Sequence, residues 1–207
     1  NSIKAINKLG IKILKKNNFY EIYGEGLNGF KPKNNITINA GNSGTFGRLI
    51  LSSLVKNETS VKLIGDKSLS KRDFFRVIKP LREFGTKIES KKNLLPIIIK
   101  GTKFLRPIDY IEKIGSAQCK SAVMIAALNT PGITKIKAKK SRNHTELFFK
   151  YLKIPITLKK EKKFDIIKIR GLRQYSAFNY EIPGDISSAS FFIALTVLSE
   201  SSELTIK

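Results

Sequence analysis

Three stretches of this chain follow one pattern of apolar and lysine residues, and this repetition constrains the fold more than any other feature. They read INKLGIKILKKNN, LREFGTKIESKKN and FKYLKIPITLKKE, beginning at Ile6, Leu81 and Phe149. In each stretch the end of an amphipathic helix leads through a short turn to a strand and then to a lysine-rich turn. The first turns fall at positions 10, 85 and 153, which lie 75 and 68 residues apart. The sequence therefore predicts a structural unit of about 70 residues, repeated nearly three times.

The turn position of the repeat is typical of a left-handed backbone just past a helix end. Gly10 and Gly85 suit that conformation because glycine has no Cβ to clash. Lys153 occupies the third copy, and we expect strain there unless that turn differs from the other two.

Local patterns predict the remaining elements of the repeat. Strands are expected at 59–65, 86–89, 95–100, 108–114, 132–138, 156–159 and 164–169. Helices are expected at 70–84, 117–128, 144–152 and 187–198, the first with an apolar face of Phe75, Ile78, Leu81 and Phe84. The repeated order strand-helix-strand-helix-strand-strand indicates an α/β fold.

Composition narrows the setting in which the chain works. Its 207 residues are 41% hydrophobic, which is enough for one large domain or two small ones. No apolar run approaches the roughly 20 residues that span a bilayer.

The single cysteine, Cys119, excludes an internal disulfide and indicates a reducing compartment, so we expect a cytoplasmic protein. With one histidine and one cysteine, a transition-metal site is not expected. Because the chain starts without methionine and stops in a strand-like segment, we expect it to be an internal piece of a longer protein.

The formal net charge of +23 raises the possibility of nucleic-acid binding. However, only eight of the 39 basic residues are arginine, and the lysines are dispersed along the chain. We therefore favour scattered surface charge, and a preference for anionic small molecules stays open.

Two loops of small residues precede expected helices, at 41–45 and at 115–118. A helix start leaves N–H groups unpaired and carries partial positive charge, so small residues there let an anion approach. Simple capping of the helices by Ser43 and Ser116 is the alternative. Neither loop matches a P-loop or a dinucleotide-binding motif.

Several further residues stand near helix starts. Arg72 and Arg142 draw attention because arginine is scarce in this chain and its planar fork suits phosphate or carboxylate. Asn143 with Glu146 predicts a capping box that leaves His144 as a packing residue of the first turn. Asp185 reads as the cap of a buried helix.

Five stretches together resemble one family. They read AGNSGTFGRL, GDKSLSKRDFFRVIKPLREFG, GSAQCKSAVMIAALNTPG, SRNHTELF and PGDISSASFF, and their order and spacing are similar to those of the 3-phosphoshikimate 1-carboxyvinyltransferase (EPSP synthase) family. The resemblance implies an EPT/RTPC-like, inside-out α/β barrel with two domains of three βαβαββ units each. It implies that residues 1–182 are most of the first globular domain and that 183–207 hold the hinge and the start of the second.

The resemblance also implies a reaction. The family transfers the enolpyruvyl group of phosphoenolpyruvate to the 5-hydroxyl of shikimate 3-phosphate and releases phosphate, a step of aromatic amino acid biosynthesis. It implies no cofactor and no metal. We expect these two small molecules as partners, a monomer, and neither nucleic acid nor membrane as a partner.

Site residues follow from the resemblance by position. Ser116, Ala117, Gln118, Ser141 and Arg142 match residues that hold shikimate 3-phosphate. Gly44, Arg72 and Gln118 match residues that hold phosphoenolpyruvate. No catalytic residue is assigned, because the family's acid–base groups are expected beyond Lys207 and its lysine-serine-arginine motif before Asn1. We therefore expect no turnover from these 207 residues alone.

One departure from the family's sequence pattern concerns the neighbour of Arg72, and two alternatives to this family are considered. Asp73 stands where the family usually has proline, so it either weakens the pull of Arg72 on an anion or caps the following helix. The first alternative is the sister enzyme that transfers enolpyruvyl to UDP-N-acetylglucosamine, which depends on a mobile-loop cysteine or aspartate, whereas Cys119 is expected to pack inside a helix. The second alternative is a basic nucleic-acid-binding module.

Overall fold

The computed structural model describes residues 1–32, 35–172 and 175–206. These residues form two compact units, Asn1–Ser176 and Ala177–Lys207. Within the segment 183–207, which the sequence analysis assigned to the hinge and the second domain, only Lys207 lies outside the described residues. The division falls six residues before the expected boundary between 182 and 183. The assignment of the two units to a first and a second globular domain stays a prediction.

The middle copy of the repeat forms a four-stranded mixed sheet. Its elements are β3 (Ile36–Asn39), α2 (Gly44–Ser53), β4 (Val61–Ile64), α3 (Phe75–Glu83), β5 (Lys87–Ser90) and β6 (Ile97–Lys100). The strand order is β3-β4-β6-β5, with β3 parallel to β4 and the other pairs antiparallel.

The third copy repeats this topology strand for strand. Its elements are β7 (Asp109–Glu112), α4 (Ala117–Leu128), β8 (Ile133–Lys139), α5 (His144–Tyr151), β9 (Ile156–Lys160) and β10 (Phe164–Arg170), in the order β7-β8-β10-β9. Again the first pair is parallel and the others are antiparallel. The first copy contributes its helix–strand–strand end, α1 (Ser2–Lys8), β1 (Lys12–Lys15) and β2 (Tyr20–Tyr23). The predicted α/β fold and the predicted repeat are confirmed.

The repeated turn has the expected left-handed backbone in all three copies. Gly10 and Gly85 have φ of 95° and 111°, and Lys153 has φ of 54°. The third turn therefore keeps the conformation of the others despite its side chain, at a local cost of roughly 1–2 kcal/mol.

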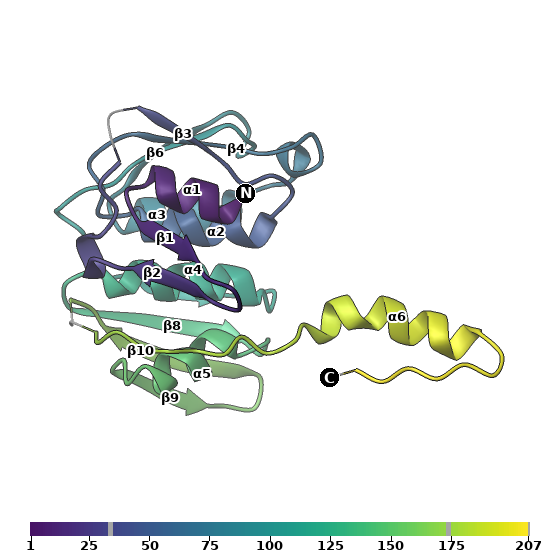
Figure 1. Cartoon of the computed structure of the whole chain (residues 1–207). Coiled ribbons are helices and arrows are strands. Elements are labelled where there is room, and N and C mark those ends of the chain that lie inside the picture. The colour runs from purple at the N-terminus through teal and green to yellow at the C-terminus, as the bar shows by residue number, and fades with distance from the viewer. Residues whose placement is uncertain (33–34, 173–174, 207) are drawn as a thin grey trace. The chain divides into compact units, whose positions relative to one another are not determined.

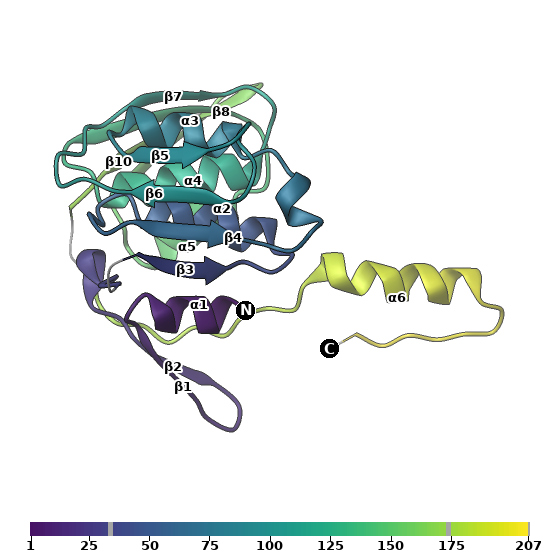
Figure 2. The ribbon, with the colours of Figure 1, turned by 90° about the horizontal axis from the view of Figure 1, so that it is seen from above.

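Helices α2, α3 and α4 of the first unit lie inside, and its two four-stranded sheets lie outside (Figure 1). Figures 1 and 2 show α2, α3 and α4 between the sheet that contains β3, β4 and β6 and the sheet that contains β8 and β10. Because α4 packs against α2 and α3 as well as against β7, β8 and β10, it is buried on nearly every side. The strands alternate buried and exposed side chains, so each sheet turns one face to these helices. This arrangement brings the starts of α2 and α4 into contact.

The predicted helix 70–84 is wrong in its first turn. A short 3-10 helix, η2 (Leu69–Lys71), is followed by extended backbone at Arg72, and α3 begins only at Phe75. The Asp73 side chain accepts a hydrogen bond from the Phe75 N–H at 2.6 Å, which fixes the start of α3. As a result Phe74 is the buried residue, at 1% exposure, while Phe75 is 45% exposed.

The second unit contains one helix, α6 (Ile186–Leu198), among its described residues. Asp185 caps it as predicted, accepting from the Ser187 N–H and the Ser188 hydroxyl, and these hydrogen bonds lower the pKa of its carboxyl. The helix is apolar on every side, and its own unit buries none of its side chains. The prediction that α6 is buried is therefore not met within this unit.

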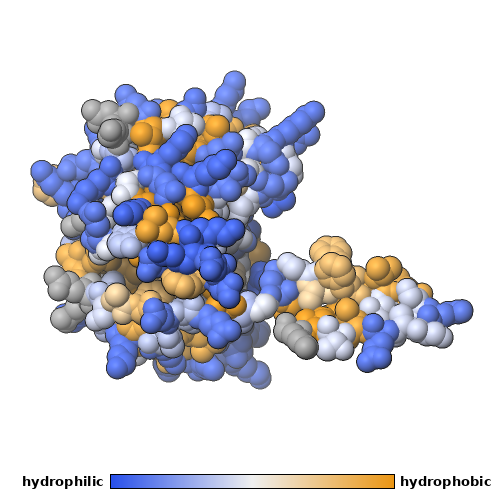
Figure 3. All heavy atoms as spheres, in the orientation of Figure 1, coloured by the Kyte–Doolittle hydropathy of each residue, from blue (hydrophilic) through white to orange (hydrophobic). Residues whose placement is uncertain are grey.

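Hydrophilic side chains are spread over the face of the first unit that Figure 3 shows, interspersed with apolar ones. This distribution agrees with the dispersed lysines of the sequence. No helix in the described part of the chain is long and apolar enough to cross a membrane.

Candidate functional site

The first loop of small residues leads from β3 into α2. Asn39 accepts a hydrogen bond from the Gly41 N–H at 2.8 Å, which turns the chain at the end of the strand. Ser43 then caps α2, and its hydroxyl accepts from the Phe46 N–H at 3.1 Å. Capping therefore occurs as predicted, and among the described residues no partner accepts from the N–H groups of Gly44 and Thr45.

Gly44, the first residue of α2, lies directly beneath two guanidinium groups. A Cβ added at Gly44 would stand 2.6 Å from Arg48 Nη1 and 3.4 Å from Arg72 Nη1. A side chain at this position would therefore displace Arg48 and fill the space where the two cations meet. The sequence placed Gly44 and Arg72 in one site, and the structure brings them together.

Arg72 reaches Gly44 because the segment after β4 folds back over α2. Asp66 accepts a hydrogen bond from the Leu69 N–H at 2.7 Å, and Leu69 is fully buried beside Gly44. Asp73 bonds the helix start, because its carboxylate accepts from the Phe75 N–H, although Phe74 is the N-cap residue; the expected effect of Asp73 on Arg72 stays a prediction.

Gln118, in the first turn of α4, joins the two helix starts. Its Oε1 accepts a hydrogen bond from Arg48 Nη1 at 3.0 Å, and its Nε2 donates to Thr45 Oγ1 at 2.7 Å. One side chain of the third copy therefore bonds both sides of the α2 start. This contact makes a single site from loops whose bonded residues lie 70 and 73 positions apart in sequence.

Arg48 is half-buried and is surrounded by like charges. Its guanidinium lies 5.0 Å from the centre of the Phe74 ring and donates to the Asp73 carbonyl at 3.4 Å. Burial lowers the pKa of Arg48 most, and Arg72 and Arg76 lower it further, partly offset by Cys119 and Asp73. The group stays protonated at neutral pH, so the site holds a concentration of positive charge suited to an anion.

The second loop of small residues leads from β7 into α4. The Ser116 hydroxyl accepts from the Cys119 N–H at 3.3 Å and caps α4 as predicted. Behind the loop, the carboxylate of Glu112 accepts hydrogen bonds from the backbone N–H groups of Ile114, Gly115 and Ser116. Cys119 is 1% exposed and packs inside the helix, as expected.

The segment that carries Ser141 and Arg142 lies beside this loop. A Cβ added at Gly115 would stand 3.2 Å from the Lys140 carbonyl oxygen. The Ser141 hydroxyl oxygen is buried and bonds no described residue. Arg142 is exposed, and its carbonyl accepts a hydrogen bond from Lys120 Nζ at 3.0 Å.

Lys120 also forms a buried ion pair that overturns the predicted capping box. Its Nζ lies 2.6 Å from Glu146 Oε1, and the two side chains are 1% and 2% exposed. Asn143 is the N-cap of α5 without a side-chain hydrogen bond, because Glu146 turns inward to Lys120 rather than back to Asn143. His144 is exposed rather than packed.

The structure thus gathers all the residues that the sequence proposed around two adjoining helix starts. It adds others that the sequence analysis did not assign to the site, namely Thr45, Arg48, Glu112 and Lys120. Arg48 lies one helical turn after Gly44, and this spacing places both residues on the same face of α2, so it could have identified Arg48 as a site residue. The partners of Glu112 and Lys120 depend on the tertiary fold, and no local pattern identifies them.

The fold and the site define a class of protein, an α/β protein of repeated units in which two helix starts meet beside a cluster of guanidinium groups. A protein-family model described as EPSP synthase (3-phosphoshikimate 1-carboxyvinyltransferase) matches residues 1–207. Among the described residues, no three His, Cys, Asp or Glu side chains are grouped as a metal site would require. The chain belongs to the EPSP synthase family.

Individual relatives agree with this assignment. The 3-phosphoshikimate 1-carboxyvinyltransferase of Streptococcus mutans is 40% identical over 210 residues, covering 100% of this chain and 48% of that protein. The protein of the same name from Vesicomyosocius okutanii is 40% identical and is covered to 46%. A solved EPSP synthase from Acinetobacter baumannii superimposes with a TM-score of 0.80 at 33% identity, over 96% of this chain and 44% of that one. The chain therefore spans about half the length of the relatives it matches.

Proposed function

We propose that this chain supplies the anion-holding part of an enzyme that transfers the enolpyruvyl group of phosphoenolpyruvate to the 5-hydroxyl of shikimate 3-phosphate. The products are 5-enolpyruvylshikimate 3-phosphate and phosphate. The observation that carries the proposal is the pair of hydrogen bonds by which Gln118 accepts from Arg48 and donates to Thr45, because this pair joins two helix starts into one site. Family membership supports the same reaction and does not favour transfer to UDP-N-acetylglucosamine or nucleic-acid binding.

The charges of the site suit two acidic substrates. In the proposal, phosphoenolpyruvate lies over Gly44 against Arg72 and Arg48, where its negative charge offsets the crowding of cations. The phosphate of shikimate 3-phosphate lies at the start of α4, against Ser116, the Ala117 N–H and Gln118. Ser141 and Arg142 close the other side of that phosphate.

The reaction proceeds by addition and then elimination. The 5-hydroxyl oxygen adds to C2 of phosphoenolpyruvate while the hydroxyl proton is lost and the methylene carbon gains a proton. The methyl group then gives up a proton as the bond from C2 to the phosphate oxygen breaks. Cations that stay fixed near the phosphate favour its departure, because they stabilise the charge that develops on it. We assign no proton-transfer group to the described residues.

The test is phosphate release by the full-length protein that contains these residues, given both substrates, with the enolpyruvyl product identified by ³¹P NMR. UDP-N-acetylglucosamine replaces shikimate 3-phosphate in a parallel reaction. We expect product only with shikimate 3-phosphate, and release of phosphate only with the sugar nucleotide would refute the proposal.

A matched pair of variants locates the activity. Arg72→Met should abolish most of the turnover, because it removes one of the guanidiniums over Gly44. Arg170→Met removes an exposed arginine opposite Ile133, at the end of β8 remote from Ser141, and should leave turnover unchanged. Equal losses in the two variants would mean that general charge, and not this site, supports the reaction.

A further inference from the structure

Glu112, the last residue of β7, is a buried carboxylate at the base of the proposed phosphate loop. It is 3% exposed. Its Oε1 accepts from the Ile114 N–H at 3.3 Å, and its Oε2 accepts from the N–H groups of Gly115 and Ser116, the latter at 3.0 Å. Three successive N–H groups therefore face Glu112 and are turned away from any ligand at the front of the loop.

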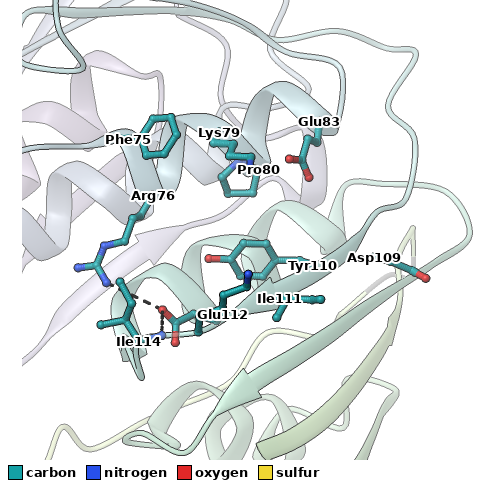
Figure 4. Close-up of a pocket in the computed structure, with 11 residues that line it drawn as sticks. Phe75, Arg76, Lys79, Pro80, Glu83, Asp109, Tyr110, Ile111, Glu112 and Ile114 are labelled. Carbon is teal, nitrogen blue, oxygen red and sulfur yellow. Dashed lines mark hydrogen bonds and ion pairs between the residues drawn. The ribbon is translucent and has the colours of Figure 1, made fainter.

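Arg76 approaches Glu112 from the other copy of the repeat. It extends from α3 across a cleft of about 420 Å³ between α3 and β7, and its Nη1 lies 3.9 Å from Glu112 Oε1. Figure 4 shows this ion pair at the end of the cleft, together with the hydrogen bond that Glu112 accepts from the Ile114 N–H. The Arg76 side chain is 47% exposed, so water screens the pair in part.

We propose that Glu112 is a positioning residue for the phosphate of shikimate 3-phosphate, and that Arg76 shields its charge from that phosphate. The inference rests on the function proposed above. Glu112 fixes the backbone of 114–116, which in turn directs the Ser116 hydroxyl and the first free N–H groups of α4 toward the ligand. A bare carboxylate so close to a phosphate would repel it, and the nearby guanidinium reduces that repulsion.

Isosteric replacement separates geometry from charge. Glu112→Gln keeps the shape of the side chain, but an amide offers one acceptor oxygen where the loop presents N–H groups to two. Either the Ile114 N–H or the N–H groups of Gly115 and Ser116 would then face the NH₂ group of the glutamine, and two donors cannot bond each other. The loop must therefore rearrange, although the carboxylate charge that repels the phosphate has been removed. Arg76→Met has the opposite character, because it leaves the loop bonded and exposes the charge of Glu112.

The experiment measures the dissociation constants of shikimate 3-phosphate and of phosphoenolpyruvate separately, by calorimetry on the full-length protein. Glu112→Gln should weaken shikimate 3-phosphate about tenfold or more, the scale of a lost charge-assisted hydrogen bond, and phosphoenolpyruvate less than about twofold. Arg76→Met should weaken shikimate 3-phosphate by about two- to fivefold, and Arg76→Lys should restore it. In the Glu112→Gln background, Arg76→Met should have a smaller effect than it has alone, because no carboxylate is left to shield.

Asp109→Asn is the matched control. Asp109 lies on the same strand and lines the same cleft, but its side chain is 74% exposed and pairs with Lys135 at 3.7 Å. This variant should bind both substrates as the unaltered protein does.

The possible failures are distinguishable. An unaltered protein that binds neither substrate would overturn the proposed function. If the unaltered protein binds both, the positioning role would be overturned by a Glu112→Gln variant that kept its affinity for shikimate 3-phosphate. It would also be overturned if that variant lost both substrates equally along with its melting temperature, since Glu112 would then act only in folding.

Discussion

The two complete copies of the repeat share one topology, but the charged side chains at their first helix starts differ. Guanidinium groups gather at the start of α2, whereas buried carboxylates lie at the start of α4. At the start of α2, Arg48 and Arg72 converge over Gly44, and the carboxylate of Asp73 bonds the start of α3. At the start of α4, buried carboxylates hold the structure, with Glu112 bonded to the loop and Glu146 paired to Lys120. Topology thus places the two helix starts side by side, and the charged side chains decide what each can do.

Under the proposed function, this difference gives the two copies different roles in substrate binding. The α2 start carries positive charge that is not neutralised, and burial with like charges lowers the pKa of Arg48. An anion would relieve that crowding. The α4 start carries charges already matched to each other, so its contribution is a fixed geometry for the Ser116 loop and for Arg142. Variants of each start should therefore fail in different ways.

The largest expected effect is on the stability of the α4 side. Lys120→Met leaves Glu146 buried without a partner and should lower the free energy of unfolding by about 3–5 kcal/mol. Lys120→Met combined with Glu146→Leu should recover most of this loss, because an apolar pair can replace a buried ion pair. Urea unfolding followed by circular dichroism measures both. If the double variant were no more stable than the single one, the pair would not be the source of the effect.

Much of the scaffold could be predicted from the sequence because its signals are local. The helix Ala117–Leu128 was expected at its observed bounds, and the turn glycines at 10 and 85 have the expected left-handed backbone. The predicted helix 70–84 was wrong in its first turn, because the Asp73 carboxylate accepts a hydrogen bond from the Phe75 N–H and α3 begins only there. Periodicity does not register such a competing bond.

The site was predictable only in part. Gly44, Arg72, Ser116 and Arg142 stand at helix starts or in recognisable motifs, so the sequence proposed them. The inward turn of Glu146 depends on Lys120, which lies 26 residues earlier on another helix. The same holds for Glu112 and Arg76, whose meeting requires two copies of the repeat to pack together.

A second effect concerns binding on the α4 side. Arg142→Ala should weaken shikimate 3-phosphate by about 1.5–3 kcal/mol, the scale of a hydrogen bond to a charged group. Phosphoenolpyruvate should bind as before, since Arg142 is held through Lys120 in the third copy and not beside Gly44. Calorimetry on the full-length protein tests both affinities, with Arg170→Ala as the control. An unchanged dissociation constant for shikimate 3-phosphate would contradict the assignment of Arg142.

On the α2 side, a Gly44→Ala change should weaken binding without lowering stability. Gly44→Ala places a Cβ 2.6 Å from Arg48 Nη1, and we expect phosphoenolpyruvate to bind about tenfold more weakly, or about 1.4 kcal/mol. Alanine also favours a helix over glycine, so the melting temperature should not fall once Arg48 has shifted. Calorimetry and thermal unfolding together check this. A loss of stability with unchanged affinity would show that Gly44 serves packing alone.

The smallest effect tests the repeat itself. Lys153 has the left-handed backbone that Gly10 and Gly85 have in the other copies, so Lys153→Gly should raise the free energy of unfolding by about 0.5–1 kcal/mol. The reciprocal change, Gly85→Lys, should lower it by more, because φ of 111° at Gly85 lies further from the region open to side chains than φ of 54° at Lys153. Urea unfolding of the two variants compares them directly. If neither change altered the free energy of unfolding, the left-handed backbone would carry no measurable cost for a side chain at these turns. The copies would then be equivalent in topology alone.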